Sequence, residues 1–305
     1  MPGPGLTTWR RSLDSAGIHD PALRRDYGVQ RRLVARERRS SYLAARLLLP
    51  PALLPHVVAA TAVMHHGDDL LDTGPKPQRV AAWASWEQRV RKALETGAGD
   101  DPLIRTLLHT VAARPRLRAV VEEYLATADA ELEFSGFATE GDYQAYVDAY
   151  SMPAFMLVGT LVGPEDDDGR FRAACRTLID GAQRLDFLND LAEDLREGRL
   201  GIPEQTLQRY GVTVGDLAAG RVPEGLRALL DDQLAVARAS LEAAREVRAL
   251  TPPPHRPLLD AVIGIELLTA DAVRSRGPAL LLRGSARPPL GGTLRILRGA
   301  RRGGG

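Results

Sequence analysis

Residues 65–72 of this chain read His65-His66-Gly67-Asp68-Asp69-Leu70-Leu71-Asp72. On an α-helix the spacings of four and three residues place Asp68 and Asp69 on the same side as Asp72. Like charges at these spacings destabilise an isolated helix by about 0.2 to 0.5 kcal/mol per pair, so the cluster needs a compensating charge. Mg²⁺ prefers carboxylate oxygens and supplies that charge. The alternative is a solvated helix end before the turn at Gly74.

A second acidic segment, residues 183–197, reads QRLDFLNDLAEDLRE. Its acids recur every three or four residues, so they too align on one helical face. Two such faces opposed across a helical bundle would hold metal ions between them. The predicted metal ligands are Asp68, Asp69, Asp72, Asn189, Asp190, Glu193, Asp194 and Glu197. Of these, the predicted catalytic residues are Asp68, Asp72, Asp190 and Asp194.

The rest of the chain indicates an all-α fold. Apolar residues recur at intervals of three and four, and Pro and Gly breaks divide the sequence into about eight to ten helices. Pro153 lies inside an apolar segment, so we expect a kink or a helix start there. A single domain is expected over residues 1–283. Gly, Pro and Arg dominate residues 284–305, which predicts a disordered tail.

Composition narrows the choice of function classes. The formal net charge of +1 over 305 residues gives no field that would attract nucleic acid. Cys175 is the single cysteine, which excludes an intramolecular disulfide and fits a cytoplasmic setting, as does the lack of a secretory signal pattern. The pattern that would indicate NADPH binding, a strand followed by GxGxxG before a helix, does not stand out in the sequence. The sequence says nothing about oligomeric state.

If metal ions lie between the acidic helices, they would bind a diphosphate and neutralise its charge as a C–O bond breaks. The resulting allylic carbocation needs an apolar cavity that excludes water. Candidate wall residues are Tyr150, Met152, Phe155, Met156 and Phe187. Such an apolar substrate predicts transient membrane contact, although no amphipathic anchor stands out.

These residues resemble the squalene/phytoene synthase family. The resemblance rests on residues 40–50, on Tyr150 with residues 158–163, and on a set in the second acidic segment and its continuation: Gln183, Asp190, Glu193, Asp194, Gly198, Arg199 and Pro203. It implies a helical bundle with a central cavity, an allylic prenyl diphosphate substrate, and Mg²⁺, expected as three ions with Mn²⁺ as an alternative. The substrate-binding residues expected from it, and from the cavity argument, are His65, Tyr150, Gln183, Asp186, Phe155, Phe187 and Arg283.

The chain departs from the family pattern at five positions. Thr61 and His65 replace a Tyr and an Arg, Asp186 and Asn189 replace an Asn and an Arg, and Gly201 replaces a later Tyr. A neutral His lacks the guanidinium fork of Arg, which weakens the binding of two diphosphates.

The same segments also resemble the motifs of class I terpene cyclases. Residues 68–72 match DDxxD, and residues 189–197 approach NDxxSxxxE with Glu193 in place of Ser. We therefore expect ionisation and cyclisation of one C15 or C20 substrate. Head-to-head coupling of two farnesyl or geranylgeranyl diphosphates is the alternative. An inactive lipid-binding helical protein is a third hypothesis, which the intact acidic motifs disfavour.

Overall fold

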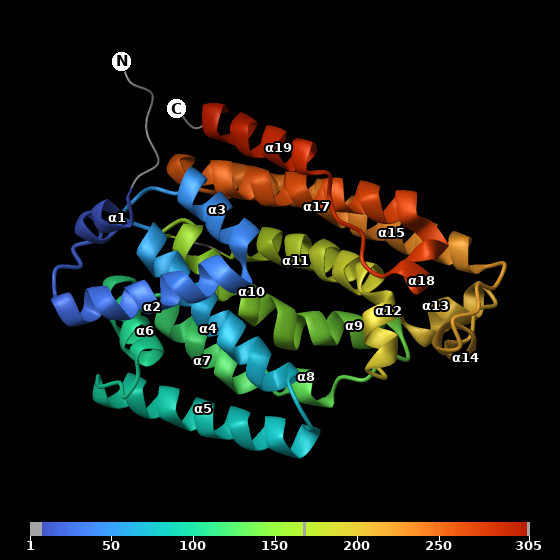
Figure 1. Cartoon of the computed structure of the whole chain (residues 1–305), viewed down its shortest axis with the longest axis horizontal. Coiled ribbons are helices and arrows are strands. Elements are labelled where there is room, and N and C mark those ends of the chain that lie inside the picture. Colours follow the sequence, from blue (N-terminus) through green and yellow to red (C-terminus); the bar gives the residue numbers. More distant parts are fainter. Residues whose placement is uncertain (1–7, 167–168, 304–305) are drawn as a thin grey trace.

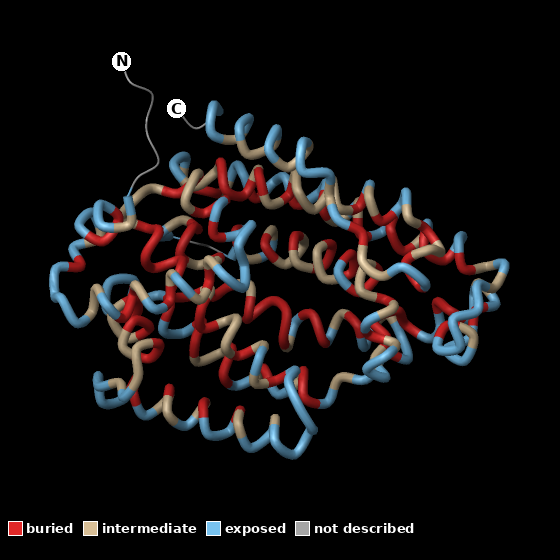
Figure 2. Tube along the Cα trace, in the orientation of Figure 1, coloured by how far each residue is buried: buried red, intermediate tan, exposed pale blue. Residues whose placement is uncertain are grey.

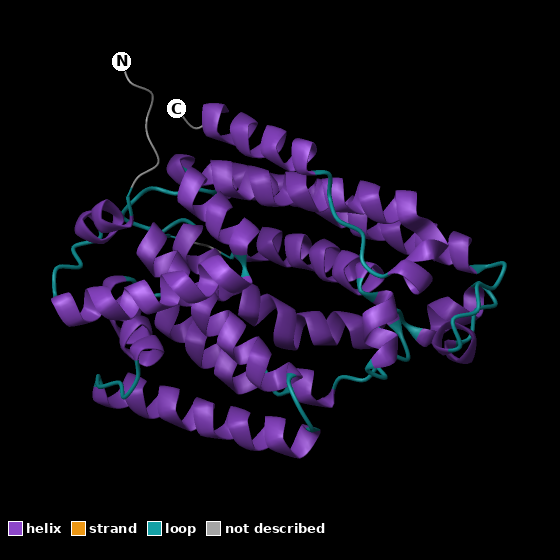
Figure 3. Ribbon diagram, viewed as in Figure 1, coloured by secondary structure: helices purple, strands orange, loops and turns teal. Residues whose placement is uncertain are grey.

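The computed structural model describes residues 8–166 and 169–303, which form an all-helical bundle (Figures 1 and 3). This confirms the predicted fold class. Among these residues, β-type pairing is confined to one isolated bridge between Gly136 and Leu200. The helices are α1 (Trp9–Ser15), α2 (Pro21–Glu37), α3 (Arg39–Leu48), α4 (Leu54–Asp72), α5 (Lys76–Thr96), α6 (Pro102–Ala113), α7 (Leu117–Thr127), α8 (Ala130–Glu133), α9 (Glu140–Tyr146), α10 (Met152–Val162), α11 (Arg170–Asn189), α12 (Leu191–Arg196), α13 (Glu204–Arg209), α14 (Val214–Ala218), α15 (Leu226–Ala243), α16 (Val247–Leu250), α17 (Arg256–Arg276), α18 (Leu280–Arg283) and α19 (Leu290–Gly303).

The helices outnumber the eight to ten predicted because several are a single turn or two long. Some of these short helices, such as α8 and α12, begin without a Pro or Gly break before them. The long helices α4, α10 and α11 form the centre of the bundle. α2 and α6 cover α4, α7 packs along α10, and α15 packs along α11 (Figure 1). Figure 2 shows α10 buried over most of its length.

Local sequence explains the helix starts around the site. The Asp101 side chain caps α6 by accepting hydrogen bonds from the backbone N–H groups of Leu103 and Ile104. Thr139 and Asp142 form a capping box at the start of α9. These caps satisfy backbone donors that a helix start leaves free.

Pro153 lies in the first turn of α10, directly after a turn of π-helix, Val147–Ser151, that joins α9 to α10. Turns of π-helix are frequent at functional sites, and this one carries Tyr150. The continuous stretch 140–162 is long and apolar enough to cross a membrane, but 67% of its most apolar window is buried inside the protein, as in a core helix.

The C-terminal region differs from the predicted disordered tail. Within residues 284–305, Leu290–Gly303 forms α19, which packs against α3 and α17 (Figure 1). Its contact with α17 is close, since a Cβ on Gly292 would lie 2.7 Å from a methyl carbon of Leu268. Residues 304 and 305 lie outside the described part of the chain.

Gly67 allows α4 to approach α7 closely. A Cβ at this position would lie 2.1 Å from the hydroxyl oxygen of Tyr124, a ring that is fully buried. We expect Gly67→Ala to lower the free energy of unfolding by about 1 to 3 kcal/mol, because the overpacking outweighs the helix propensity gained. Urea denaturation measures this, with Gly28→Ala in α2, where the nearest side-chain atom would lie 3.7 Å from the Cβ, as the control.

A buried polar cluster joins α2, α4 and α6. The Tyr27 hydroxyl contacts His109 Nδ1 at 2.9 Å and Thr110 Oγ1 at 2.8 Å, while His56 Nδ1 lies 3.3 Å from the same Thr110 oxygen. Burial, with Arg114 and His109 nearby, lowers the pKa of His56 to about 4. Neutral His56 therefore favours the folded state.

This lowered pKa predicts a pH-dependent stability. Neutral His56 contributes fully to the free energy of unfolding above pH 6.5. This contribution is lost as the pH falls toward 4, and the loss at pH 4 is about 3 kcal/mol. We expect unfolding free energies of the wild type and His56→Gln to converge over this range. A difference between them that does not change with pH would contradict the prediction.

Candidate active site

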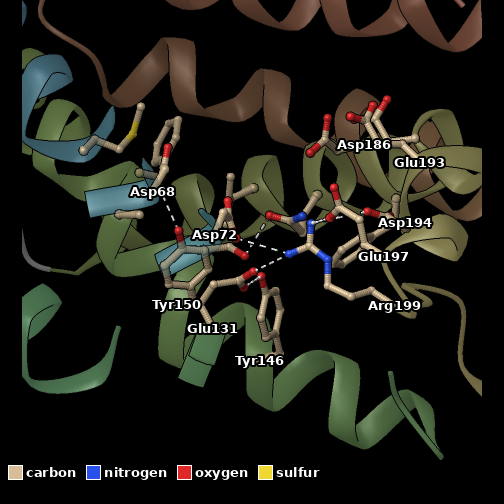
Figure 4. Close-up of a pocket in the computed structure, with 18 of the residues that line it drawn as sticks. Asp68, Asp72, Glu131, Tyr146, Tyr150, Asp186, Glu193, Asp194, Glu197 and Arg199 are labelled. Atoms are coloured by element: carbon tan, nitrogen blue, oxygen red, sulfur yellow. Dashed lines mark hydrogen bonds and ion pairs between the residues drawn. The ribbon is translucent and has the colours of Figure 1, made fainter. Parts of the chain in front are cut away.

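A cavity of about 630 Å³ opens between the C-terminal half of α4, the π turn with α10, and the α11–α12 corner (Figure 4). Eleven of the predicted site residues line it: Asp68, Asp72, Tyr150, Phe155, Gln183, Asp186, Phe187, Asp190, Glu193, Asp194 and Glu197. Figure 4 shows Asp68 and Asp72 on one side and Asp186, Glu193, Asp194 and Glu197 on the other. The two acidic segments thus face one cavity, in the arrangement that the spacing predicts.

Asp68 is held by partners from two other elements. The Tyr150 hydroxyl donates a hydrogen bond of 2.8 Å to Asp68 Oδ1, and Arg38, between α2 and α3, lies 3.5 Å from Oδ2. Burial is the main reason why the pKa of Asp68 is raised. The π turn that carries Tyr150 therefore fixes one oxygen of Asp68, and the other oxygen lies near Arg38.

Arg199 joins the two acidic sides. Its guanidinium nitrogens lie 3.2 Å from Asp72, 3.0 Å from Glu131, 3.7 Å from Asp194 and 2.7 Å from Glu197. Figure 4 shows the guanidinium between Asp72 and Glu197. One cation thus serves four carboxylates, which leaves the cavity with a net negative charge.

Three acids of the cavity have raised pKa values, mainly because they are buried. Burial, with Asp190 nearby, raises the pKa of Asp186 to about 7, and burial raises that of Asp194 to about 7 despite Arg199. The pKa of Glu131 rises to about 8, mainly through burial, while its carboxylate accepts a hydrogen bond from the Tyr146 hydroxyl and pairs with Arg199. The cavity is therefore short of positive charge.

Apolar side chains line the same cavity. They are Met64, Ala154, Phe155, Ile179 and Phe187, of which Phe155 and Phe187 were predicted as walls for a prenyl chain. Phe187 stacks among other aromatic rings, including Phe134 and Tyr146. The cavity thus combines carboxylates with apolar side chains.

Comparison with known proteins agrees with this geometry. Residues 34–292 match the family model described as squalene/phytoene synthase. The chain belongs to the squalene/phytoene synthase family. Over 227 residues it is 32% identical to the bifunctional protein CrtB/UppS of Streptomyces coelicolor, covering 74% of this chain and 40% of that protein. Over 239 residues it is 27% identical to the phytoene synthase of Thermus thermophilus, covering 74% of this chain and 80% of that one.

The chain spans about half or less of the length of some of these relatives, including 51% of phytoene synthase 3 of Zea mays. Solved structures share its fold. The squalene synthase HpnC of Alicyclobacillus acidocaldarius superposes with a TM-score of 0.72 at 24% identity, covering 95% of this chain and 98% of that one. A dehydrosqualene synthase gives 0.80 at 19% identity, covering 92% and 97%.

Six predicted residues do not line the cavity: the candidate wall residues Met152 and Met156, and His65, Asp69, Asn189 and Arg283. Asp69 has a side chain 59% exposed and lies 3.8 Å from His65 Nε2, which is likewise not on the cavity wall. Arg283 is exposed at the end of α18. Asn189 turns its amide to the C-terminal segment, where it accepts a 2.7 Å hydrogen bond from Ala286 N and donates one of 3.2 Å to Ala286 O.

The Asn189 contact bears on the cyclase-like motif. α11 ends at Asn189 and α12 begins at Leu191, so residues 189–197 do not form the continuous helix that was expected. Asp190, Glu193, Asp194 and Glu197 still reach the cavity, but Asn189 is occupied elsewhere. The structure therefore separates Asn189 from its expected partners Glu193 and Glu197.

Several lining residues were not among the predicted site residues: Arg38, Met64, Glu131, Tyr146, Ser151, Ala154, Ile179 and Arg199. Arg199 stood in the family motif as a match without an assigned role. The others carry no local signal, because Arg38 and Glu131 come from separate helix ends that only the fold brings to the cavity.

Gly201, one of the departures from the family pattern, makes room for Phe187. A Cβ on Gly201 would lie 2.0 Å from Cγ of the Phe187 ring. The aromatic ring of Phe187 thus lies where a side chain at position 201 would begin. Phe187 and Gly201 are a matched pair in this chain.

The donor set fits Mg²⁺, which takes carboxylate oxygens and keeps several waters. Among the described residues, no three His, Cys, Asp or Glu side chains are already close enough together to ligate one metal ion. Family members are typically Mg²⁺-dependent. Divalent ions would bring positive charge to these carboxylates, among which Asp186 and Asp194 have a pKa raised to about 7, mainly by burial.

Proposed function

We propose that this protein is a head-to-head prenyltransferase that joins two allylic prenyl diphosphates and releases diphosphate. The observation that carries the proposal is a cavity lined both by acids of the two segments and by apolar side chains. Family membership and the phytoene synthases among the relatives support coupling. Support for the one-substrate cyclisation expected from the sequence is weaker, because Asn189 is bonded to Ala286.

In the proposed reaction the diphosphates lie beside the acidic side chains of the cavity. Asp68 and Asp72 on one side, and Asp190, Asp194 and Glu197 on the other, would hold Mg²⁺, which neutralises the charge of the departing diphosphate. Arg38 lines the same cavity and is placed to donate hydrogen bonds to phosphate oxygens. Tyr150 keeps Asp68 turned toward the cavity.

The apolar side chains of the cavity shield the allylic cation from water. Heterolysis of the C–O bond sends its electron pair to the diphosphate and leaves an allylic cation on the first chain. The π electrons of the second chain then form the new C–C bond, and a proton is lost. Phe155, Ile179 and Phe187 exclude the water that would otherwise trap the cation as an alcohol.

The test is incubation of the purified protein with Mg²⁺ and farnesyl or geranylgeranyl diphosphate, followed by mass analysis of the products. Coupling predicts a product with twice the carbon count of its substrate. A hydrocarbon or alcohol of unchanged carbon count would show a one-substrate synthase. Absence of turnover with either substrate would favour the lipid-binding hypothesis.

A further inference from the structure

The C-terminal helix α19 and the segment before it carry an unusual charge. Residues 283–303 contain six arginines and no acidic residue, in a chain whose net charge is only +1. On α19 the arginines Arg295, Arg298, Arg301 and Arg302 are all exposed. The positive charge is therefore concentrated on one helix at the surface.

The same region holds the most exposed large apolar side chains of the described residues. Leu290 is 81% exposed, Leu282 66% and Leu294 50%. Leu290 and Leu294 are four residues apart, and Arg298 follows at the same spacing, so the three lie along one side of α19. The outer surface of α19 is thus apolar at its start and cationic at its end.

The opposite side of α19 is already occupied. Ile296 and Ala300 pack against the core of the bundle, and the Cγ2 methyl of Ile296 would lie 3.2 Å from a Cβ on Gly264 of α17. Figure 1 shows α19 at the outer edge of the bundle beside α17, and Figure 2 shows its outward turns exposed. Leu290 and Leu294 therefore remain exposed although α19 packs against the bundle.

We infer that α19 is a docking surface for an anionic lipid bilayer, lying in the plane of the membrane. Arginines favour anionic headgroups, and leucines beside them enter the apolar layer beneath. A nucleic acid would match the arginines but would leave Leu290 and Leu294 in water. The bilayer is the partner that accounts for both features.

The position of α19 places this surface next to the cavity. The segment that leads into it contacts the cavity's acidic corner, where the Ser285 hydroxyl donates a 2.6 Å hydrogen bond to Asp190. α19 also packs against α3, whose preceding residue Arg38 lines the cavity. A docked α19 would hold the cavity close to the layer in which apolar chains dissolve.

The experiment is co-sedimentation of the full chain with vesicles, without any substrate, so that its outcome is independent of the proposed reaction. We expect binding to vesicles containing phosphatidylglycerol, weak binding to pure phosphatidylcholine, and a loss of binding at high salt. The variant Arg295→Gln/Arg298→Gln/Arg302→Gln should bind about a hundredfold more weakly. Leu290→Ser/Leu294→Ser should weaken binding to anionic vesicles at low salt, where the wild type binds.

The matched control removes three exposed cations elsewhere, Lys92, Arg209 and Arg245, each replaced by Gln. It changes the net charge equally and should bind vesicles like the wild type. An unchanged thermal midpoint shows that the α19 variants fold. Equal losses in control and α19 variants, no preference for anionic vesicles, or binding of heparin but not of vesicles would each overturn the inference.

Discussion

Replacing Asp68 by Asn is expected to lower kcat/KM for prenyl diphosphate turnover by on the order of 10³-fold. Asp68 lines the cavity, and the change removes a negative charge where the proposal places Mg²⁺ and the departing diphosphate. Its hydrogen bond from Tyr150 survives, because the Asn carbonyl still accepts it. The loss should therefore appear in catalysis and not in the thermal midpoint.

The neighbouring aspartate provides a matched control. Asp69→Asn is the same chemical change one residue away, on a side chain that is 59% exposed and outside the cavity wall. We expect its kcat/KM to stay within about twofold of the wild type, because substitutions on the surface away from a site usually have small effects. Equal losses in the two variants would contradict the placement of the site.

Replacing Arg199 by Gln is expected to destabilise the protein in the absence of divalent ions by about 2 to 4 kcal/mol. The variant leaves four carboxylates without their shared cation, and Glu131 and Asp194 among them are nearly buried. Breaking a buried pair costs about 3 to 5 kcal/mol, and partial exposure of Arg199 reduces that figure. Urea denaturation in the presence of a chelator measures the loss.

Mg²⁺ should restore much of this stability. Without Arg199 the carboxylates attract divalent ions more strongly, so the rise in thermal midpoint on adding Mg²⁺ should be larger for the variant than for the wild type. Arg238→Gln, which breaks an exposed pair with Asp271, is the control and should cost under about 1 kcal/mol with no response to Mg²⁺. An unchanged Mg²⁺ response in Arg199→Gln would show that Arg199 does not share these carboxylates with metal.

Helical periodicity placed Asp68 and Asp72 on one side of a helix, and both line the cavity. They are one helical turn apart on α4. Asp69 points elsewhere, as the 100° step between neighbouring helix residues already implied, so a stricter use of the same geometry would have excluded it. Sequence spacing is thus informative within one regular helix.

Long-range contacts account for the residues that sequence reasoning misplaced. The side chain of Asn189 is fixed by Ala286, almost a hundred positions later, and this contact cannot be read from either segment alone. Glu131 reaches Arg199 from the one-turn helix α8. The sequence did not predict α19 because its glycines lower the helix propensity, although Leu290, Leu294 and Leu297 stand at helical spacing.

The proposed enzyme joins two prenyl chains in one cavity. The most direct measurement is turnover of an equal mixture of unlabelled and fully deuterated farnesyl diphosphate with Mg²⁺, followed by mass analysis of the products. Coupling predicts products of doubled carbon count in three mass classes: light, mixed and heavy. Products of unchanged carbon count in only two classes, with no mixed species, would contradict it.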